Sequence, residues 1–143
     1  MEKALIWNNF CVSLRRISEF DRIMESGNYI SFGSKSVKIK VSIYTFKEND
    51  VFIAYCPSLD ISGYDHDETA AIDDFRTMLS EYISWQLEHG TLDADLASHG
   101  WSVGSGKGRE PGLAEMLVRN EQLRNIVTGS YSKTNLNTTC AHA

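Results

Sequence analysis

The sequence predicts an α+β fold in which a small antiparallel sheet of three to four strands packs against one long helix. Apolar and polar residues alternate over residues 37–44, and a second strand-like run follows at residues 51–55 after a polar KEND turn. Apolar residues then recur at helical spacing between residues 67 and 88. This order indicates a hairpin whose inner face is covered by the helix that follows it.

The first two strands are expected to form an antiparallel hairpin with one buried face and one wet face. In the first strand the apolar positions are Val37, Ile39, Val41 and Ile43, and the alternating positions are Lys38, Lys40, Ser42 and Tyr44. Pro57 ends the second strand because proline has no backbone donor. Leu59, Ile61 and Tyr64 suggest a third short strand, which Gly63 bounds.

The long helix is predicted to begin at Asp67 and to reach residue 88. The Asp67 carboxylate can accept hydrogen bonds from the free amides of the first turn, and Glu68 suits the positive end of the helix dipole. The buried stripe consists of Ile72, Phe75, Leu79, Tyr82, Ile83 and Leu87. Gly90 is expected to end the helix in the left-handed C-cap conformation.

Shorter elements are predicted after this helix. We expect a short helix over residues 91–98 and a last short strand over residues 101–103. Residues 104–112 are rich in glycine, which predicts a linker. Residues 113–129 have the spacing of one amphipathic helix, and the polar tail over residues 130–143 is expected to be mobile.

The predicted elements divide the chain into four segments. They are an N-terminal amphipathic helix in residues 1–28, a β-β-β-α-β domain in residues 29–103, a glycine-rich linker in residues 104–112, and a C-terminal helix with a mobile tail in residues 113–143. The N-terminal segment has an apolar stripe over residues 3–24. Met24 is an alternative start, which would leave residues 1–23 outside the native protein.

The composition is that of a folded protein with one domain. The chain has 143 residues, of which 42% are hydrophobic and 23% are charged. A net charge of −5 argues against a constitutive nucleic-acid binder and suits a protein that meets a basic partner. The three cysteines lie far apart without CxxC spacing, as is typical of reduced thiols. With no apolar run of about 20 residues and no signal peptide, we expect a cytoplasmic protein that does not span a membrane.

One cluster of acidic residues suggests an enzymatic alternative. Asp60, Asp65, Asp67 and Glu68 fall within nine consecutive residues, and carboxylates grouped in space can bind Mg²⁺ for hydrolysis. Acidic residues are also favoured around a turn and a helix start because they cap free amides. A divergent metal-dependent hydrolase is therefore the less favoured alternative.

A nucleic-acid-binding module on the outer sheet face is the second alternative. Lys38, Lys40 and Tyr44, together with Phe46 and Lys47, would form a basic stripe with aromatic residues. Lysines on a wet strand also protect a sheet from unwanted edge pairing. The overall acidity of the chain favours this protective role.

The other candidate motifs fail on spacing. The histidines have no metal-ligand spacing, and both His89 and His99 precede glycines that end helices, where a cation suits the dipole. The GSGKG run lacks the first glycine and the final Ser or Thr of a phosphate-binding loop. Cys56 is expected to be a small buried hydrophobe. We therefore predict no catalytic, cofactor-binding or metal-binding residue, and no cofactor.

Several short motifs occur in the order found in a known family. They are IAYCPSL at residues 53–59, an SGY turn at residues 62–64, the helix start at residues 67–75, LEHGTL at residues 87–92 and HGW at residues 99–101. With these motifs, residues 37–103 resemble the HicB-like antitoxin domain of type II toxin–antitoxin systems. The family more often has a glycine and a threonine-capped helix start where this chain has Asp65, His66 and Asp67.

The resemblance implies a partial ribonuclease-H-like fold without the active site of that enzyme. HicB-like domains neutralise a small basic mRNA-cleaving toxin of the HicA type, so the resemblance implies a non-enzymatic antitoxin or an orphan regulator. We expect a homo-oligomer, because short sheets with open edges tend to pair. DNA binding is not expected, because residues 113–129 supply one helix where a helix-turn-helix needs two, and no basic strand suggests a ribbon-helix-helix.

Overall fold

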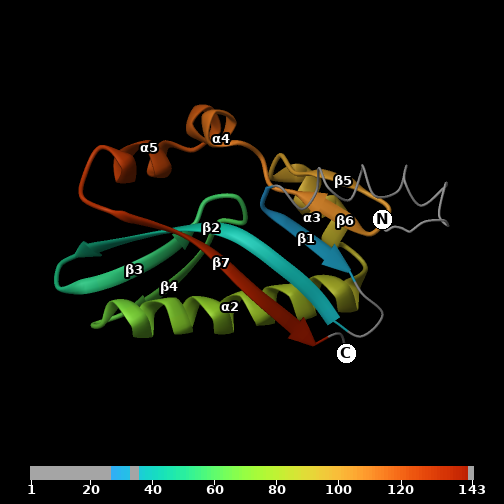
Figure 1. Cartoon of the computed structure of the whole chain (residues 1–143), viewed down its shortest axis with the longest axis horizontal. Coiled ribbons are helices and arrows are strands. Elements are labelled where there is room, and N and C mark those ends of the chain that lie inside the picture. Colours follow the sequence, from blue (N-terminus) through green and yellow to red (C-terminus); the bar gives the residue numbers. More distant parts are fainter. Residues whose placement is uncertain (1–26, 33–35, 142–143) are drawn as a thin grey trace, which may run out of the picture.

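The computed structural model describes residues 27–32 and 36–141, and it has an α+β architecture (Figure 1). The strands are β1 (Tyr29–Phe32), β2 (Ser36–Glu48), β3 (Val51–Cys56), β4 (Ile61–Asp65), β5 (Ser102–Gly104), β6 (Lys107–Arg109) and β7 (Ser132–Ala141). The helices are α2 (Glu68–His89), α3 (Leu92–Ser98), α4 (Leu113–Arg119) and α5 (Glu121–Val127). The helix predicted for residues 3–24 and the alternative start at Met24 lie outside the described residues.

Within the described part of the chain, one antiparallel sheet contains seven strands, more than the three to four predicted. The strand order is β4-β3-β2-β1-β6-β5, and β7 pairs with β2 off this path. Strand β2 is the centre of the sheet, because β1 pairs with its beginning and β3 with its end. Strand β7 pairs with β2 from Ser36 to Thr45 and overlaps both of these partners, so it occupies the opposite edge (Figure 1).

The predicted hairpin of β2 and β3 is confirmed. Glu48 pairs with Val51, so the connecting loop consists of Asn49 and Asp50 alone. Both loop residues have positive φ, 53° and 64°, which matches the twist of two-residue hairpin turns. Asparagine and aspartate tolerate this conformation better than most residues with a side chain.

The third strand is also present, but Gly63 does not bound it. Gly63 lies inside β4 and pairs with Ala54 of β3. A Cβ atom at this position would lie 2.6 Å from the carbonyl oxygen of Ala71 and closer still to the backbone nitrogen of Phe75. Glycine is therefore required because the backbone of α2 lies directly against the strand.

Helix α2 has the caps that its sequence predicts. The Asp67 side chain accepts from the backbone N–H of Ala70 at 3.1 Å, and Gly90 ends the helix with a φ of 65°. Buried side chains of α2 pack on the inner face of the sheet; they are Ala71, Phe75, Leu79, Ile83 and Gln86. Ile72, Tyr82 and Leu87 of the predicted stripe are partly buried against the same core.

Part of the outer face of the sheet, over β2 and β3, is buried as well, which corrects the wet face expected there. Helices α4 and α5 lie across it, opposite α2 (Figure 1). They form a second core with β2 and β3, made of Tyr44, Ile53, Tyr55, Met116, Leu123 and Ile126. Ser42 and Tyr44, predicted to face water, are 4% and 1% exposed. At Ser42 and Tyr44 the alternation of β2 therefore separates two buried faces, whereas Lys38 near the start of the strand is exposed.

Residues 104–112 are not a linker. Strands β5 and β6 form a hairpin through Ser105 and Gly106, whose φ values of 52° and 74° are again those of a tight turn. Strand β6 also pairs with β1. Gly106 supplies the positive φ that the turn needs. Gly108 packs closely on α3, because a Cβ atom added to it would lie 3.2 Å from the Leu96 side chain.

The Glu110 side chain fills a gap in the sheet just after this hairpin. Strand β1 pairs with β2 up to Lys40, and β3 pairs with it from Tyr44 onward. The Ser42 N–H lies between these two stretches, on the same edge of β2, and neither strand accepts its hydrogen bond. One Glu110 oxygen accepts from this N–H at 3.2 Å and from the Ser58 hydroxyl at 2.5 Å. The other accepts from the Asn28 amide at 2.7 Å. One carboxylate thus ties its own segment to three distant ones, which contain Asn28, Ser42 and Ser58.

We expect Glu110→Ala to lower the free energy of unfolding by about 2 kcal/mol, because it leaves buried donors unpaired. Chemical denaturation measures this change. Glu115→Ala is the matched control, because Glu115 is exposed on α4 and pairs with Arg119 at 3.7 Å on the surface. The control should change stability by less than about 0.5 kcal/mol. Equal effects of the two substitutions would contradict the structural role of Glu110.

The C-terminal segment differs from its prediction in two ways. It contains two helices, because Asn120 ends α4 in an extended conformation and its side chain caps α5 by accepting from the Leu123 N–H at 2.9 Å. Both helices use apolar residues to cover the sheet. The predicted mobile tail is strand β7, in which Leu136 and Cys140 point into the α2 core.

Candidate protein-binding surface

The four acidic residues considered for metal binding do not gather at one site. Asp60 and Asp65 lie at opposite ends of β4, roughly 17 Å apart at the rise of a strand. Asp60 has a φ of 57° and accepts from the Tyr55 hydroxyl at 2.9 Å. Among the described residues, no group of three or more His, Cys, Asp or Glu side chains is placed to hold a metal ion. The four acids that lie close in sequence are therefore not gathered in space as one metal site.

The other three acids meet two more at one end of the sheet. We call this surface the acidic end; it consists of Glu48, Asp50, Asp65, Asp67 and Glu68, all exposed. The β2–β3 turn contacts the loop before α2, where the His66 Nδ1 lies 3.3 Å from the Asp50 carbonyl oxygen. The Thr45 hydroxyl donates to Glu68 at 2.8 Å, which ties the start of α2 to β2.

The charge of the acidic end is strongly unbalanced. Residues 47–74 contain eight Asp and Glu residues, whereas Lys47 is the one Lys or Arg among them. Lys47 lies 3.9 Å from Asp50, but both side chains are well exposed, so water screens the pair. Two strands and a capped helix hold these carboxylates in fixed positions, and the surface is therefore suited to a basic protein partner.

Glu48 and Asp50 were missed as members of this surface, although the sequence contained the signal. In an antiparallel meander, the turn between the first two strands lies beside the end of the third strand. The observed register follows this rule, because Phe52 pairs with Asp65 and Val51 with Glu48. The KEND turn and the acids before α2 could thus have been placed together from strand order alone.

A polar cleft of about 380 Å³ lies between the β3–β4 turn, the end of α3 and the junction of α4 with α5. Within it, the Asn120 amide donates to the Tyr55 hydroxyl at 2.9 Å, and this hydroxyl donates to Asp60. His99 also lines the cleft, and its Nδ1 lies 2.9 Å from the Asp95 carbonyl oxygen. The hydrogen bond from Asn120 to Tyr55 ties the junction of α4 and α5 to the sheet.

Alkaline pH is expected to destabilise the fold through its buried tyrosines. Burial raises the pKa of Tyr44 and of Tyr55 to about 12, above the ordinary value of 10. Between these values the unfolded chain loses protons that the folded protein keeps, so the stability that these two tyrosines contribute is complete below pH 10 and is lost as the pH rises toward 12. Melting temperature measured against pH tests this expectation, and a constant value across the interval would contradict it.

The aromatic residues of the proposed nucleic-acid stripe are not available on the surface. Tyr44 is buried under the C-terminal helices, and Phe46 is partly buried against the same core. Neither ring is free to stack on a base, as binding of single-stranded nucleic acid requires. Lys38 remains exposed, whereas Lys40 is half-buried.

The remaining predicted positions are structural. Cys56 is fully buried, and this burial raises the pKa of its thiol to about 12, which leaves little thiolate at neutral pH. His89 is the last residue of α2, one residue beyond the predicted end, and its ring stacks on Trp85 with centroids 3.9 Å apart. His99 caps the end of α3.

No family model, curated protein or solved structure matches the chain in the comparisons made. The resemblance to HicB-like antitoxins therefore remains a prediction. Within the described residues, no helix has the length and apolar character needed to cross a membrane.

Proposed function

We propose that this chain is a HicB-like antitoxin, or an orphan regulator related to one, that binds a small basic mRNA-cleaving toxin of the HicA type. It acts in the cytoplasm by protein–protein contact and is not an enzyme. The observation that carries this proposal is the acidic end, where five exposed carboxylates lie on a rigid scaffold.

The physical reason is competition for a basic surface. A protein that binds and cuts RNA must present cationic groups to the phosphates. Fixed carboxylates on an acidic partner attract the same groups, speed the encounter and orient it. An antitoxin bound in this way occludes the RNA-binding surface of the toxin without any chemical step.

Co-purification tests this proposal, which expects a small basic protein to be encoded in the adjacent reading frame. Wild-type protein should bind it, and the affinity should fall as salt is raised. A triple variant with Glu48→Gln, Asp50→Asn and Asp65→Asn should bind at least about tenfold more weakly. These three acids are chosen because Asp67 and Glu68 also hold the start of α2.

The matched control removes the same charge elsewhere, with Asp93→Asn, Glu115→Gln and Glu121→Gln in the three short helices. All three side chains are exposed. The control should retain the wild-type affinity apart from a small general effect of net charge. A complex that weakens equally in both triple variants would show that the acidic end is not the binding surface.

A further inference from the structure

Among the described residues, nothing pairs with one edge of strand β7. In the described part of the chain it pairs with β2 alone, along ten residues, so its other edge presents free backbone groups. It contains no proline, and Lys133 is its one charged residue. Natural sheets usually protect a long edge with charges, proline or a covering element. An edge of this length without such protection is suited to pairing with another strand.

The outward-facing residues of β7 follow from the register. The Ser42 N–H bonds Glu110, on the side of β2 away from β7, and Ser42 pairs with Asn135. Ser42 and Asn135 are therefore a pair without mutual backbone hydrogen bonds. In an antiparallel ladder, the N–H and C=O groups of both residues in such a pair point away from the neighbouring strand. Alternate residues from Lys133 to Thr139 therefore present N–H and C=O groups outward, over about 20 Å of strand.

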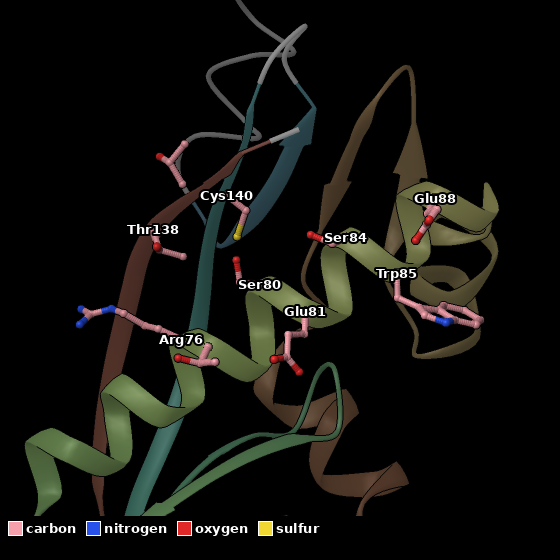
Figure 2. A pocket seen from close by; sticks show the side chains of 10 residues that line it. Arg76, Ser80, Glu81, Ser84, Trp85, Glu88, Thr138 and Cys140 are labelled. Atoms are coloured by element: carbon pink, nitrogen blue, oxygen red, sulfur yellow. The ribbon is translucent and has the colours of Figure 1, made fainter. Parts of the chain in front are cut away.

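A groove of about 650 Å³ runs beside this edge, between β7 and the outer face of α2 (Figure 2). Ser80 and Ser84 lie on its helical wall, and Thr138 and Cys140 lie on its strand side. The serines are small and leave room for another helix to approach. Trp85, 53% exposed, adds apolar area at the groove.

The helical wall of the groove carries opposite charges at its two ends and small residues between them, so it can pair with a second copy of itself. Arg76, Ser80, Ser84 and Glu88 recur at intervals of four, so they share one face of α2 over about 18 Å. When this row is reversed by a two-fold axis, Arg76, which pairs with Asp73 of its own helix at 2.9 Å, also faces Glu88 of a second copy at both ends, and the serines meet in the middle. Opposite charges thus pair twice, and the small residues allow close approach at the centre.

We propose that a second copy of this chain occupies the groove. The two β7 strands pair antiparallel, which extends the sheet across the dimer, and the two α2 helices run antiparallel on the same side. Lys133 lies near one end of β7, so a central two-fold axis places it opposite an uncharged residue and not opposite its own copy. The groove brings the helical row beside the end of β7, at Thr138, Thr139 and Cys140, so the strand edge and the helix can contact the second copy in one interface. This proposal does not depend on the toxin-binding function.

Sedimentation velocity of the full chain, with no toxin present, tests the proposal. The wild-type protein should be a dimer. Asn137→Pro should make it a folded monomer, because proline removes an outward N–H and is tolerated at an edge position. Asn137→Ala keeps the N–H and should remain dimeric.

Charge reversal provides a second test that leaves the β7 backbone unchanged. Arg76→Glu alone, or Glu88→Arg alone, places like charges opposite each other twice and should raise the dimer dissociation constant at least about tenfold. The double variant exchanges the two charges and should restore the wild-type constant. A monomeric wild-type chain would overturn the proposal, and so would a dimer that neither Asn137→Pro nor the single reversals weaken.

Discussion

Gly63→Ala is expected to destabilise the protein by about 3 kcal/mol. The added Cβ would lie 2.6 Å from the Ala71 carbonyl oxygen and nearer still to the backbone of Phe75. Flexible side chains can move away from such a contact, but the backbone of a helix held by many hydrogen bonds cannot. Helix α2 must therefore separate from β4, which loosens the core around Phe75.

Chemical denaturation of Gly63→Ala measures this loss. Gly104→Ala is the matched control, because an added Cβ at Gly104 meets nothing within 4 Å and the position is exposed in β5. The control should change the free energy of unfolding by less than about 1 kcal/mol. If both variants unfold at the same denaturant concentration, the close packing of α2 against β4 is wrong.

Removal of residues 130–143 is expected to destabilise the protein by more than about 4 kcal/mol or to abolish cooperative unfolding. The truncation removes Leu136 and Cys140 from the core, where they are 3% and 5% exposed. It also leaves β2 without its partner from Ser36 to Thr45. Thermal unfolding followed by circular dichroism measures the effect.

A point substitution in β7 gives a finer test of the same strand. Leu136→Ala should cost about 2–5 kcal/mol, as expected for a buried leucine. Thr139→Ala is its control, because this side chain is exposed on the opposite face of the strand. If the truncated chain has the same melting temperature as the full-length chain, the result would support the mobile tail predicted from sequence and contradict the structure.

Local signals predicted the centre of the fold correctly. The hairpin of β2 and β3 follows from alternation and a short polar turn, and α2 follows from its apolar period, its Asp67 cap and Gly90. Each of these signals lies within a few residues of the element that it defines. They also determined which face of β2 packs on α2.

The errors occurred where a strand depends on a distant partner. Strand β7 is polar except at Leu136 and Cys140, and its partner β2 lies about 90 residues earlier in the chain. The glycines of residues 104–112 serve a tight turn and close packing, but glycine is equally common in linkers. The wet face expected for β2 was wrong for the same reason, because the helices that bury Tyr44 come from residues 113–127.

The candidate site was predicted in part. The acids before α2 were recognised as a group, but capping chemistry and metal binding use the same residues, so sequence could not separate these roles. The structure removes Asp60 from the group and adds Glu48 and Asp50 from the hairpin turn. This exchange changes the character of the cluster from a possible metal site to an exposed acidic surface.

Inhibition of RNA cleavage is the most direct test of the proposed function. The small basic protein that the proposal expects in the adjacent reading frame would be purified, given an RNA substrate and titrated with this chain. We predict that cleavage stops at a stoichiometric amount of wild-type protein and continues when Glu48, Asp50 and Asp65 are neutralised. Undiminished cleavage in the presence of excess wild-type protein would contradict the antitoxin function.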